Sequence, residues 1–190
     1  MADAVDPYVL PPDLPVPVDD GAARHLEGLS VPALALPSTA GREIDLARQA
    51  GGTLVLYLYP RTGRPGEPLP PGWDEIPGAR GCTPQSCAFR DHFDDLTALG
   101  AGVLGLSAQP LEDQLEFAAR VGLPYPLLSD PGLALAGALR LPTFEVADMR
   151  LYRRLTLIAR EGAIVKVFYP VFPPDRNAAD VVAWLAEPDR

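Results

Sequence analysis

The chain has 190 residues, of which 47% are hydrophobic and 22% are charged, and its formal net charge at pH 7 is −9. These values are typical of one soluble domain that is large enough for a full hydrophobic core. Because no basic run offsets the negative charge, nucleic acid and anionic membranes are disfavoured as partners.

Export and membrane insertion are also disfavoured by the sequence pattern. The apolar runs are short and interrupted, so we expect no segment that spans a bilayer. The first six residues lack the charged and apolar regions of a secretory signal. The two cysteines are therefore expected to be cytoplasmic thiols with a catalytic or redox-sensing role, rather than a structural disulfide.

The first part of the chain combines an arm, a hairpin and a buried strand. Residues 1–19 contain five prolines and are predicted to form an extended arm, which leaves 20–190 as a single domain. A short helix is expected at 22–29. Two apolar segments between residues 34 and 46 have the pattern of a β-hairpin. The continuous apolar run at 54–59 is typical of a central strand, and Pro60 ends it. Residues 61–81, rich in Pro and Gly, are expected to form a long loop, called the 61–81 loop below.

The second part of the chain alternates between helix and strand periodicity. In order, the expected elements are a helix at 84–99, a strand at 103–106, a helix at 111–121, a short strand at 127–128, a helix at 133–139, strands at 155–159 and 164–168, and an amphipathic helix at 177–185. This order predicts an α/β fold with a mixed central sheet flanked by helices.

Both cysteines of the chain, Cys82 and Cys87, lie at the start of the helix expected at 84–99. Thr83 is predicted to be its N-cap and Pro84 its first helical residue. A thiol at a helix N-terminus lies among unpaired backbone N–H groups and near the positive end of the helix dipole, which both favour the thiolate. Cys82 is therefore a candidate nucleophile and Cys87 its candidate partner.

The spacing of the two cysteines also has a dynamic consequence. Residues five apart on a helix are separated by about 7.5 Å along the axis and by roughly 140° around it. A disulfide needs Cα atoms within about 7 Å and converging Cβ atoms. A Cys82–Cys87 bond and an intact helix are therefore mutually exclusive, and formation of the bond requires the helix to unwind.

The motif around these cysteines resembles one protein family. A strand ends in Tyr-Pro at Pro60, and Gly-Cys-Thr-x-x-x-Cys-x-Phe-Arg-Asp then opens a helix at residues 81–91. Together with Leu-Ser-Asp at 128–130 and Arg-Leu-Thr-Leu-Ile at 154–158, this pattern resembles the peroxiredoxins. Within them it is similar to the bacterioferritin-comigratory-protein or PrxQ subfamily, over about residues 32–185. The resemblance implies a thioredoxin-like fold.

The resemblance implies a thiol-dependent peroxidase. Cys82 would be the peroxidatic cysteine, which attacks hydrogen peroxide or an organic hydroperoxide and becomes a sulfenic acid. Cys87 would be the resolving cysteine, which closes a disulfide that a thioredoxin- or glutaredoxin-like donor reduces. No metal, flavin or haem is implied, and the resemblance favours a monomer over a dimer.

Two further residues match the family pattern. Arg154 corresponds to the arginine that stabilises the thiolate and the peroxide oxygens. Strand alternation places Arg154 and Thr156 on one face and Arg153 on the other, so we select Arg154 over its neighbour. Pro60 corresponds to the proline that shields the cysteine from solvent, although a simple role in ending the strand is equally compatible with its position.

The chain departs from the family pattern before Cys82. The family spacing places the proline seven residues before the cysteine, whereas Pro60 lies 22 positions before Cys82, which indicates an inserted loop at 66–80. The family's Thr or Ser three residues before the cysteine is Ala79 here, which has no hydroxyl to donate. Thr62 is a candidate to supply that hydroxyl, and Thr83 or a backbone N–H is the alternative.

Other functions remain open from the sequence. The departure before Cys82 leaves a redox sensor or binding protein with weak peroxidase activity as an alternative. A dithiol–disulfide oxidoreductase is a second alternative, but such enzymes usually space their thiols as Cys-x-x-Cys. A metal site built from the cysteines with His25 and His92 is disfavoured because the spacing is poor for zinc.

Overall fold

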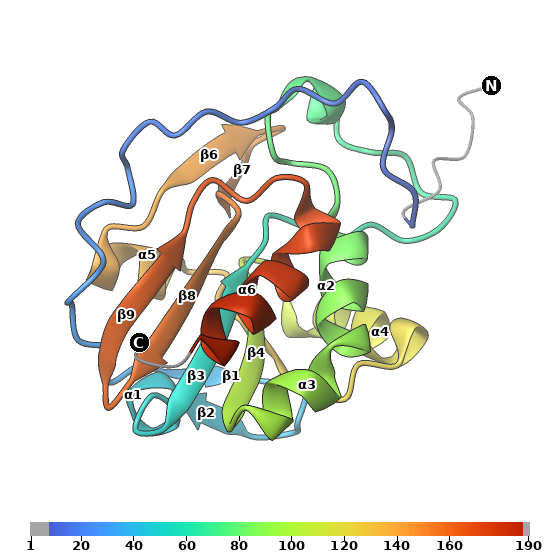
Figure 1. Ribbon diagram of the computed structural model, residues 1–190. Helices are drawn as coiled ribbons and strands as arrows, with labels where there is room; N and C mark the ends of the chain where they lie inside the picture. The colour runs from blue at the N-terminus through green and yellow to red at the C-terminus, as the bar shows by residue number, and fades with distance from the viewer. Residues whose placement is uncertain (1–7, 188–190) are drawn as a thin grey trace.

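A five-stranded mixed sheet forms the centre of the computed structural model, which describes residues 8–187 (Figure 1). Its strand order is β5-β4-β3-β8-β9. The strands are β3 (Thr53–Leu58), β4 (Ala101–Ser107), β5 (Leu127–Ser129), β8 (Leu155–Arg160) and β9 (Ala163–Phe168). β3, β4 and β5 are parallel, whereas β8 is antiparallel to β3 and β9 is antiparallel to β8. The sheet is thus mixed, as the element order predicts.

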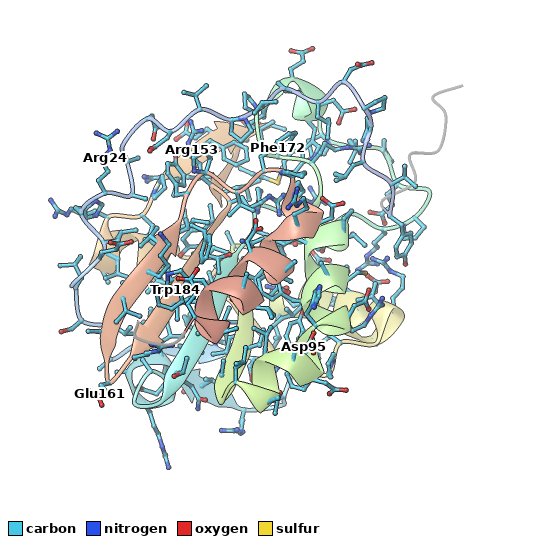
Figure 2. The ribbon with its side chains drawn as sticks, viewed as in Figure 1. Arg24, Asp95, Arg153, Glu161, Phe172 and Trp184 are labelled. Carbon is cyan, nitrogen blue, oxygen red and sulfur yellow. The ribbon has the colours of Figure 1, made fainter. Side chains whose placement is uncertain are left out.

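Helices cover both faces of this sheet. The helices are α1 (Leu46–Gln49), α2 (Cys82–Asp91), α3 (Phe93–Ala98), α4 (Leu111–Val121), α5 (Ala134–Leu139) and α6 (Asn177–Ala186). Buried side chains of α2, α3, α4 and α6 pack on one face of the sheet, and those of α1 and α5 pack on the other. Trp184 of α6, labelled in Figure 2, contacts β8: its ring centre lies 5.2 Å from the Arg160 guanidinium carbon, as in a cation–π interaction.

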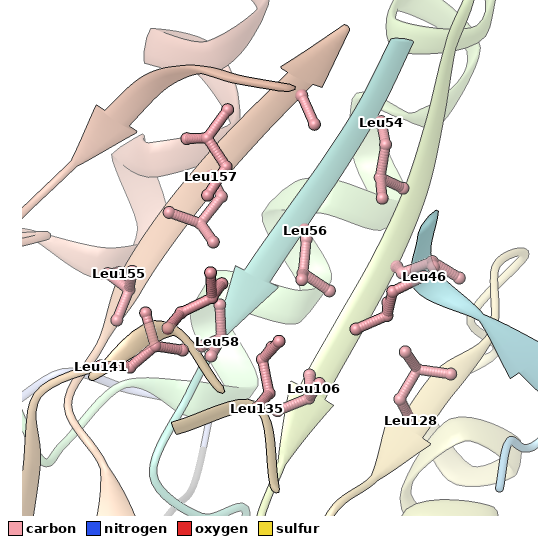
Figure 3. Packing of buried hydrophobic residues seen from close by; sticks show 14 of the residues in the cluster. Leu46, Leu54, Leu56, Leu58, Leu106, Leu128, Leu135, Leu141, Leu155 and Leu157 are labelled. Atoms are coloured by element: carbon pink, nitrogen blue, oxygen red, sulfur yellow. The ribbon is translucent and has the colours of Figure 1, made fainter. Parts of the chain in front are cut away.

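The alternation of β3 explains how one strand serves two cores. Leu54, Leu56 and Leu58 point to the α1 and α5 side and join the leucine cluster of Figure 3. Tyr57 and Tyr59 point to the opposite side, which α2, α3, α4 and α6 cover. Successive side chains of a strand face opposite ways, so an uninterrupted apolar run is what a central strand covered on both faces requires.

Two hairpins lie outside the main sheet. β1 (Ala35–Pro37) pairs with β2 (Glu43–Asp45), and β6 (Thr143–Val146) pairs with β7 (Met149–Tyr152). The sequence analysis did not predict the β6–β7 hairpin. The 61–81 loop contains a short 3₁₀ turn, η1 (Trp73–Glu75), and a second turn, η2 (Pro174–Arg176), precedes α6. The buried Trp73 ring lies 6.2 Å from that of Phe144 in β6, so the loop packs on the β6–β7 hairpin.

The expected fold class is confirmed, but one predicted helix is wrong. Residues 22–29 form successive turns instead of a helix. Their backbone bonds to the β8–β9 end of the sheet, where Gly28 N–H donates to the Ile164 carbonyl at 2.8 Å and the Ile164 N–H donates to Leu29 at the same distance. Gly28 has a φ of +88°, which a helix does not allow. Tertiary pairing therefore overrides the local pattern.

The predicted helix at 84–99 is interrupted. His92 separates α2 from α3, with a φ of −99° and a ψ of 11°. Of the expected arm at 1–19, residues 1–7 lie outside the described residues. Residues 8–19 have no helix or strand, and the division between arm and domain stays a prediction. Between residues 8 and 187, no helix is long and apolar enough to cross a membrane.

Candidate functional site

Cys82 is the first residue of α2. Gly81 is the N-cap, with a φ of +97°, and the first helical bond runs from Gln85 N–H to the Gly81 carbonyl at 3.0 Å. The prediction of Thr83 as N-cap is wrong by two residues, because the backbone turns into the helix through a left-handed conformation that favours glycine. Pro84 still falls in the first turn, where a missing N–H costs no helical bond.

The Cys82 thiol lies against a buried cation. Its side chain is 4% exposed, and its sulfur contacts the Ala79 carbonyl at 3.6 Å. Arg154 Nη2 donates to Cys82 Sγ at 3.2 Å. Arg154 precedes β8 and is itself 4% exposed, whereas Arg153 is half-buried and labelled in Figure 2. The structure therefore brings the two residues selected from the sequence into direct contact.

The Arg154 guanidinium is held by neutral groups. Its nitrogens donate to the carbonyls of Gly78, Ala79 and Arg80 at 3.0 to 3.3 Å, and Nη1 donates to the Gln85 side chain. Among residues 8–187 it forms no ion pair with a carboxylate. Beside these neutral oxygens, the sulfur of Cys82 is a further contact of the guanidinium.

A cavity opens next to Cys82 beneath the 61–81 loop. Its lining combines residues of the loop with the start of α2: Arg61, Thr62, Leu69, Pro70, Trp73, Ala79, Cys82 and Thr83. The buried Thr62 hydroxyl donates to Gln109 Oε1 at 3.1 Å, and the Thr62 N–H donates to the same oxygen at 2.8 Å. Thr62 thus shares the cavity with Cys82, with its hydroxyl oriented by Gln109.

Pro60 is placed differently from the other selected residues. It is buried directly after β3 and Tyr59, and it is outside the set that lines the cavity. Its ring ends the strand, and a shielding role for it stays a prediction.

Cys87 lies one and a half turns further along α2 and is half-buried. Both cysteines are free thiols, and the helix between them is intact, as the spacing argument requires for the reduced state. Burial raises the pKa of Cys87, and Asp91 raises it further, whereas Arg90 and Arg120 act in the opposite direction. Cys87 is therefore a weaker acid in the intact helix than in water.

Sequence reasoning missed the polar side chains that support these groups. Gln85 joins Arg154 to Asn177 at the start of α6, and Thr156 on β8 donates to the same Asn177 oxygen at 2.6 Å. Gln109 orients Thr62, and Ser86 is held by two tyrosines. Only the position of Gln85, one helical turn after Cys82, offered a signal, because residues three apart on a helix share a face.

Known proteins resemble this chain over most of its length. A family model described as Redoxin matches residues 26–183. The chloroplastic peroxiredoxin Q of Sedum lineare is 28% identical over 174 residues, which cover 92% of this chain and 85% of that protein. A putative peroxiredoxin of Mycobacterium tuberculosis is 36% identical over 108 residues, 57% of this chain and 59% of its own length.

Solved structures show the same likeness. The peroxidoxin BcpB of Mycobacterium tuberculosis superposes with a TM-score of 0.68 at 25% identity, over 85% of this chain and 97% of that one. Peroxiredoxin Q of Xanthomonas campestris superposes with a TM-score of 0.65 at 26% identity, over 85% and 95% of the two chains.

Proposed function

Since the chain belongs to the Redoxin family, with its relatives in the peroxiredoxin Q branch, we propose that Cys82 is the peroxidatic thiol of a peroxidase that reduces hydrogen peroxide or organic hydroperoxides. The observation that carries this assignment is the 3.2 Å contact between Arg154 Nη2 and Cys82 Sγ. A buried guanidinium at this distance stabilises the thiolate, which is the reactive form of cysteine.

The chemistry follows from the position of that sulfur. The Cys82 thiolate attacks one oxygen of the hydroperoxide, an S–O bond forms, and the O–O bond breaks. The sulfur becomes a sulfenic acid, and the leaving hydroxide or alkoxide takes a proton from solvent and departs as water or an alcohol. Arg154 and the unpaired N–H groups at the start of α2 stabilise the negative charge that moves from sulfur to the leaving oxygen.

Thr62 is the hydroxyl that supports this step best. Ala79 is 1% exposed and offers no hydroxyl, whereas Thr62 lines the same cavity as Cys82. Its proton is directed to Gln109, so its oxygen keeps lone pairs that accept a hydrogen bond from a bound hydroperoxide. Gln109 then sets the direction in which those lone pairs point.

Cys87 completes the proposed cycle. It is the only other cysteine of the chain, so it is the one internal thiol that can condense with the Cys82 sulfenic acid. The products are a Cys82–Cys87 disulfide and water, and a thioredoxin- or glutaredoxin-like dithiol reduces the disulfide. The intact helix of the reduced state means that α2 unwinds before this bond forms.

The test is peroxide consumption with thioredoxin as the electron donor. Wild-type protein is expected to turn over, Cys82→Ser to be inactive, and Cys87→Ser to react once and then stall or overoxidise. Mass spectrometry after one equivalent of peroxide should show the loss of two hydrogens, with the bridge mapped to both cysteines. If the wild-type protein consumes no hydroperoxide with any thiol donor, the proposal is contradicted.

A redox sensor of the same fold is the second candidate, and the buried Ala79 is the observation that favours it. Such a protein would oxidise slowly at Cys82 and change its affinity for a partner. Stopped-flow measurement of Cys82 oxidation separates the two functions, because a fast reaction excludes a protein that only senses.

A further inference from the structure

Two buried tyrosines hold the middle of α2 to the sheet. Tyr57 of β3 donates from its hydroxyl to Ser86 Oγ at 3.0 Å, and Tyr125, just before β5, donates to the Ser86 carbonyl at 2.8 Å. The two tyrosine hydroxyl oxygens lie 3.0 Å apart. Tyr57 and Ser86 are fully buried, and Tyr125 is 4% exposed. Ser86 is thus fixed through both its side chain and its backbone.

The ring of Tyr57 is positioned as closely as its hydroxyl. It stacks on Phe89 of α2, with ring centres 4.4 Å apart and planes inclined by 14°, and meets the Tyr125 ring edge-on. On its other side lies Gly105 of β4, where an added Cβ would come within 2.7 Å of the Tyr57 ring and hydroxyl. The absence of a side chain at Gly105 therefore leaves the space that the Tyr57 ring occupies against β4.

Ser86 immediately precedes Cys87, so the tyrosines hold the residue next to one of the two cysteines. Cys87 cannot meet Cys82 while the helix between them is intact, since the two are five residues apart. Unwinding of this turn moves the Ser86 carbonyl and side chain. Both tyrosine hydrogen bonds must then break, and buried groups that lose their partners make that opening costly.

We propose that Tyr57, Tyr125 and Ser86 form a latch on α2, acting as positioning residues that set how often the helix opens and therefore how fast Cys87 reaches the Cys82 sulfenic acid. This inference rests on the proposed function for its catalytic meaning. The balanced step is the condensation of a sulfenic acid with a thiol, in which an S–S bond forms, the S–O bond breaks and water leaves.

The latch also controls the fate of the sulfenic acid. While α2 is closed, the sulfenic acid is exposed to a second peroxide, which oxidises it to the sulfinic acid. A tighter latch therefore favours overoxidation, and a looser latch favours the disulfide. The tyrosine hydroxyls remain donors at neutral pH, because burial raises the pKa of Tyr57 and of Tyr125 well above that of free tyrosine.

The first test measures opening of α2 without any peroxide. Amide hydrogen exchange is recorded on the reduced protein for wild type, Tyr57→Phe and Tyr125→Phe. Each variant loses one hydroxyl, so we expect exchange of the α2 amides to become roughly two- to tenfold faster. Tyr152→Phe is the matched control, since Tyr152 is also fully buried but its hydroxyl donates to Asp130 at 2.5 Å on the other face of the sheet.

The second test measures bond formation. Diamide takes two hydrogens from a pair of thiols and closes their disulfide, so it reports on the encounter of Cys82 and Cys87 independently of peroxide chemistry. We expect faster closure in Tyr57→Phe and Tyr125→Phe than in Tyr152→Phe. With hydrogen peroxide, the first phase, Cys82 oxidation, should be unchanged, the second phase faster and the sulfinic product less abundant.

Ser86→Ala provides a variant that keeps both tyrosines. It removes the Tyr57 contact but retains the carbonyl that Tyr125 holds. Tyr57→Phe and Ser86→Ala should be non-additive in a double-mutant cycle, because they remove the same hydrogen bond. Unchanged α2 exchange and closure in these variants, or an equal acceleration in Tyr152→Phe, overturns the latch. A wild-type protein that closes its disulfide with diamide but not with peroxide instead contradicts the proposed peroxidase function.

Discussion

Gln85 Oε1 accepts a hydrogen bond from Nη1 of Arg154, one helical turn after the thiol that the same guanidinium contacts. The Gln85 amide nitrogen donates in turn to Asn177 Oδ1 at 3.0 Å. Thr156 donates to that oxygen at 2.6 Å. The position of the cation therefore depends on α2, α6 and β8 together, and α2 supplies both the thiol and a support for its partner.

Gln85→Met should slow the oxidation of Cys82 without unfolding the protein. The substitution keeps the length of the side chain but removes the acceptor for Arg154, and a hydrogen bond to a charged group contributes about 1.5–3 kcal/mol. We expect a decrease of about tenfold or more in the second-order rate constant with peroxide, measured by stopped flow. Gln49→Met, at an exposed position in α1, is the control. Equal rates in the two variants would contradict a supporting role for Gln85.

Gly81→Ala should damage the site more than a glycine substitution elsewhere in the loop. An added Cβ at Gly81 would lie 2.2 Å from Pro174 Cγ and 2.8 Å from Leu10 Cδ2, at a φ of +97°. Gly72 has a φ of +76° but nothing within 4 Å, so Gly72→Ala measures backbone strain alone.

We expect Gly81→Ala to lower both the free energy of unfolding and the rate of Cys82 oxidation. Gly72→Ala should lower only the former, by about 1 kcal/mol. Urea unfolding and stopped-flow oxidation measure the two effects. The explanation fails if Gly72→Ala impairs oxidation as strongly as Gly81→Ala does.

The sequence predicted the parts of the fold whose pattern is strong and local. The apolar run of β3 and the periodicity of α4 correspond closely to the observed elements. The β6–β7 hairpin was not predicted because its turn is made by Ala147 and Asp148, both with positive φ, instead of the Asn-Gly or Asp-Gly pair that signals such a turn. Its strands also lack alternation, because β6 has no fully buried residue and the two buried residues of β7, Leu151 and Tyr152, are adjacent.

The candidate site was predictable only in its reactive groups. Cys82 was selected from its position at a helix start and Arg154 from the family motif, and the structure places them in contact. Gln85, Asn177 and Gln109 were not selected. Apart from the position of Gln85 one turn after Cys82, their spacing gives no signal, because their roles depend on partners that are distant in the chain. The Asn177 contact with Gln85 joins residues 92 positions apart. Local periodicity holds no information about such a pair.

Gly105→Ala should destabilise the protein, because β4 has no room for a methyl group there. An added Cβ would lie 2.5 Å from Leu127 Cδ2 and 2.7 Å from the Tyr57 ring. Overpacking of this kind costs about 1–3 kcal/mol. Gly102 lies on the same strand, and its nearest contact would be an ordinary 3.9 Å from the Thr53 carbonyl. Gly102→Ala should therefore change the free energy of unfolding in urea by less than about 0.5 kcal/mol, and a similar loss in both variants would refute the packing argument.

Thr62→Val should distinguish the effect of the Thr62 hydroxyl from the effect of the size of its side chain. Valine is similar in size but cannot accept a hydrogen bond from a hydroperoxide or donate to Gln109. We expect the rate of Cys82 oxidation to fall by about 10²-fold, the effect of removing one positioned polar group from a reaction centre. Thr62→Ser keeps the hydroxyl and should retain most of the rate. If valine and serine react alike, the hydroxyl comes from elsewhere, with Thr83 or a backbone N–H as the remaining candidates.

Formation of the Cys82–Cys87 bond should accelerate as the pH rises above neutrality. Burial and then Asp91 raise the pKa of Cys87 above its usual value of 9.0, whereas Arg90 and Arg120 lower it. Near neutral pH, Cys87 is therefore mainly a thiol, and its thiolate fraction grows roughly tenfold per pH unit until the pH reaches the raised pKa. The closed helix holds this proton more tightly than an unwound segment does, so increasing pH also favours the opening of α2.

Asp91→Asn should shift this pH profile toward lower pH. The substitution removes a charge that raises the pKa of Cys87, and it also frees Arg90 from an ion pair of 2.8 Å. Both effects favour the thiolate, so bond formation at pH 7 should become faster. Asp95→Asn on α3 is the matched control, since Asp95, labelled in Figure 2, is exposed and pairs with His92. Quenched-flow mass spectrometry across pH 6–10 measures the rate of disulfide formation. A profile that Asp91→Asn leaves in place, or moves to higher pH, contradicts the role assigned to this carboxylate.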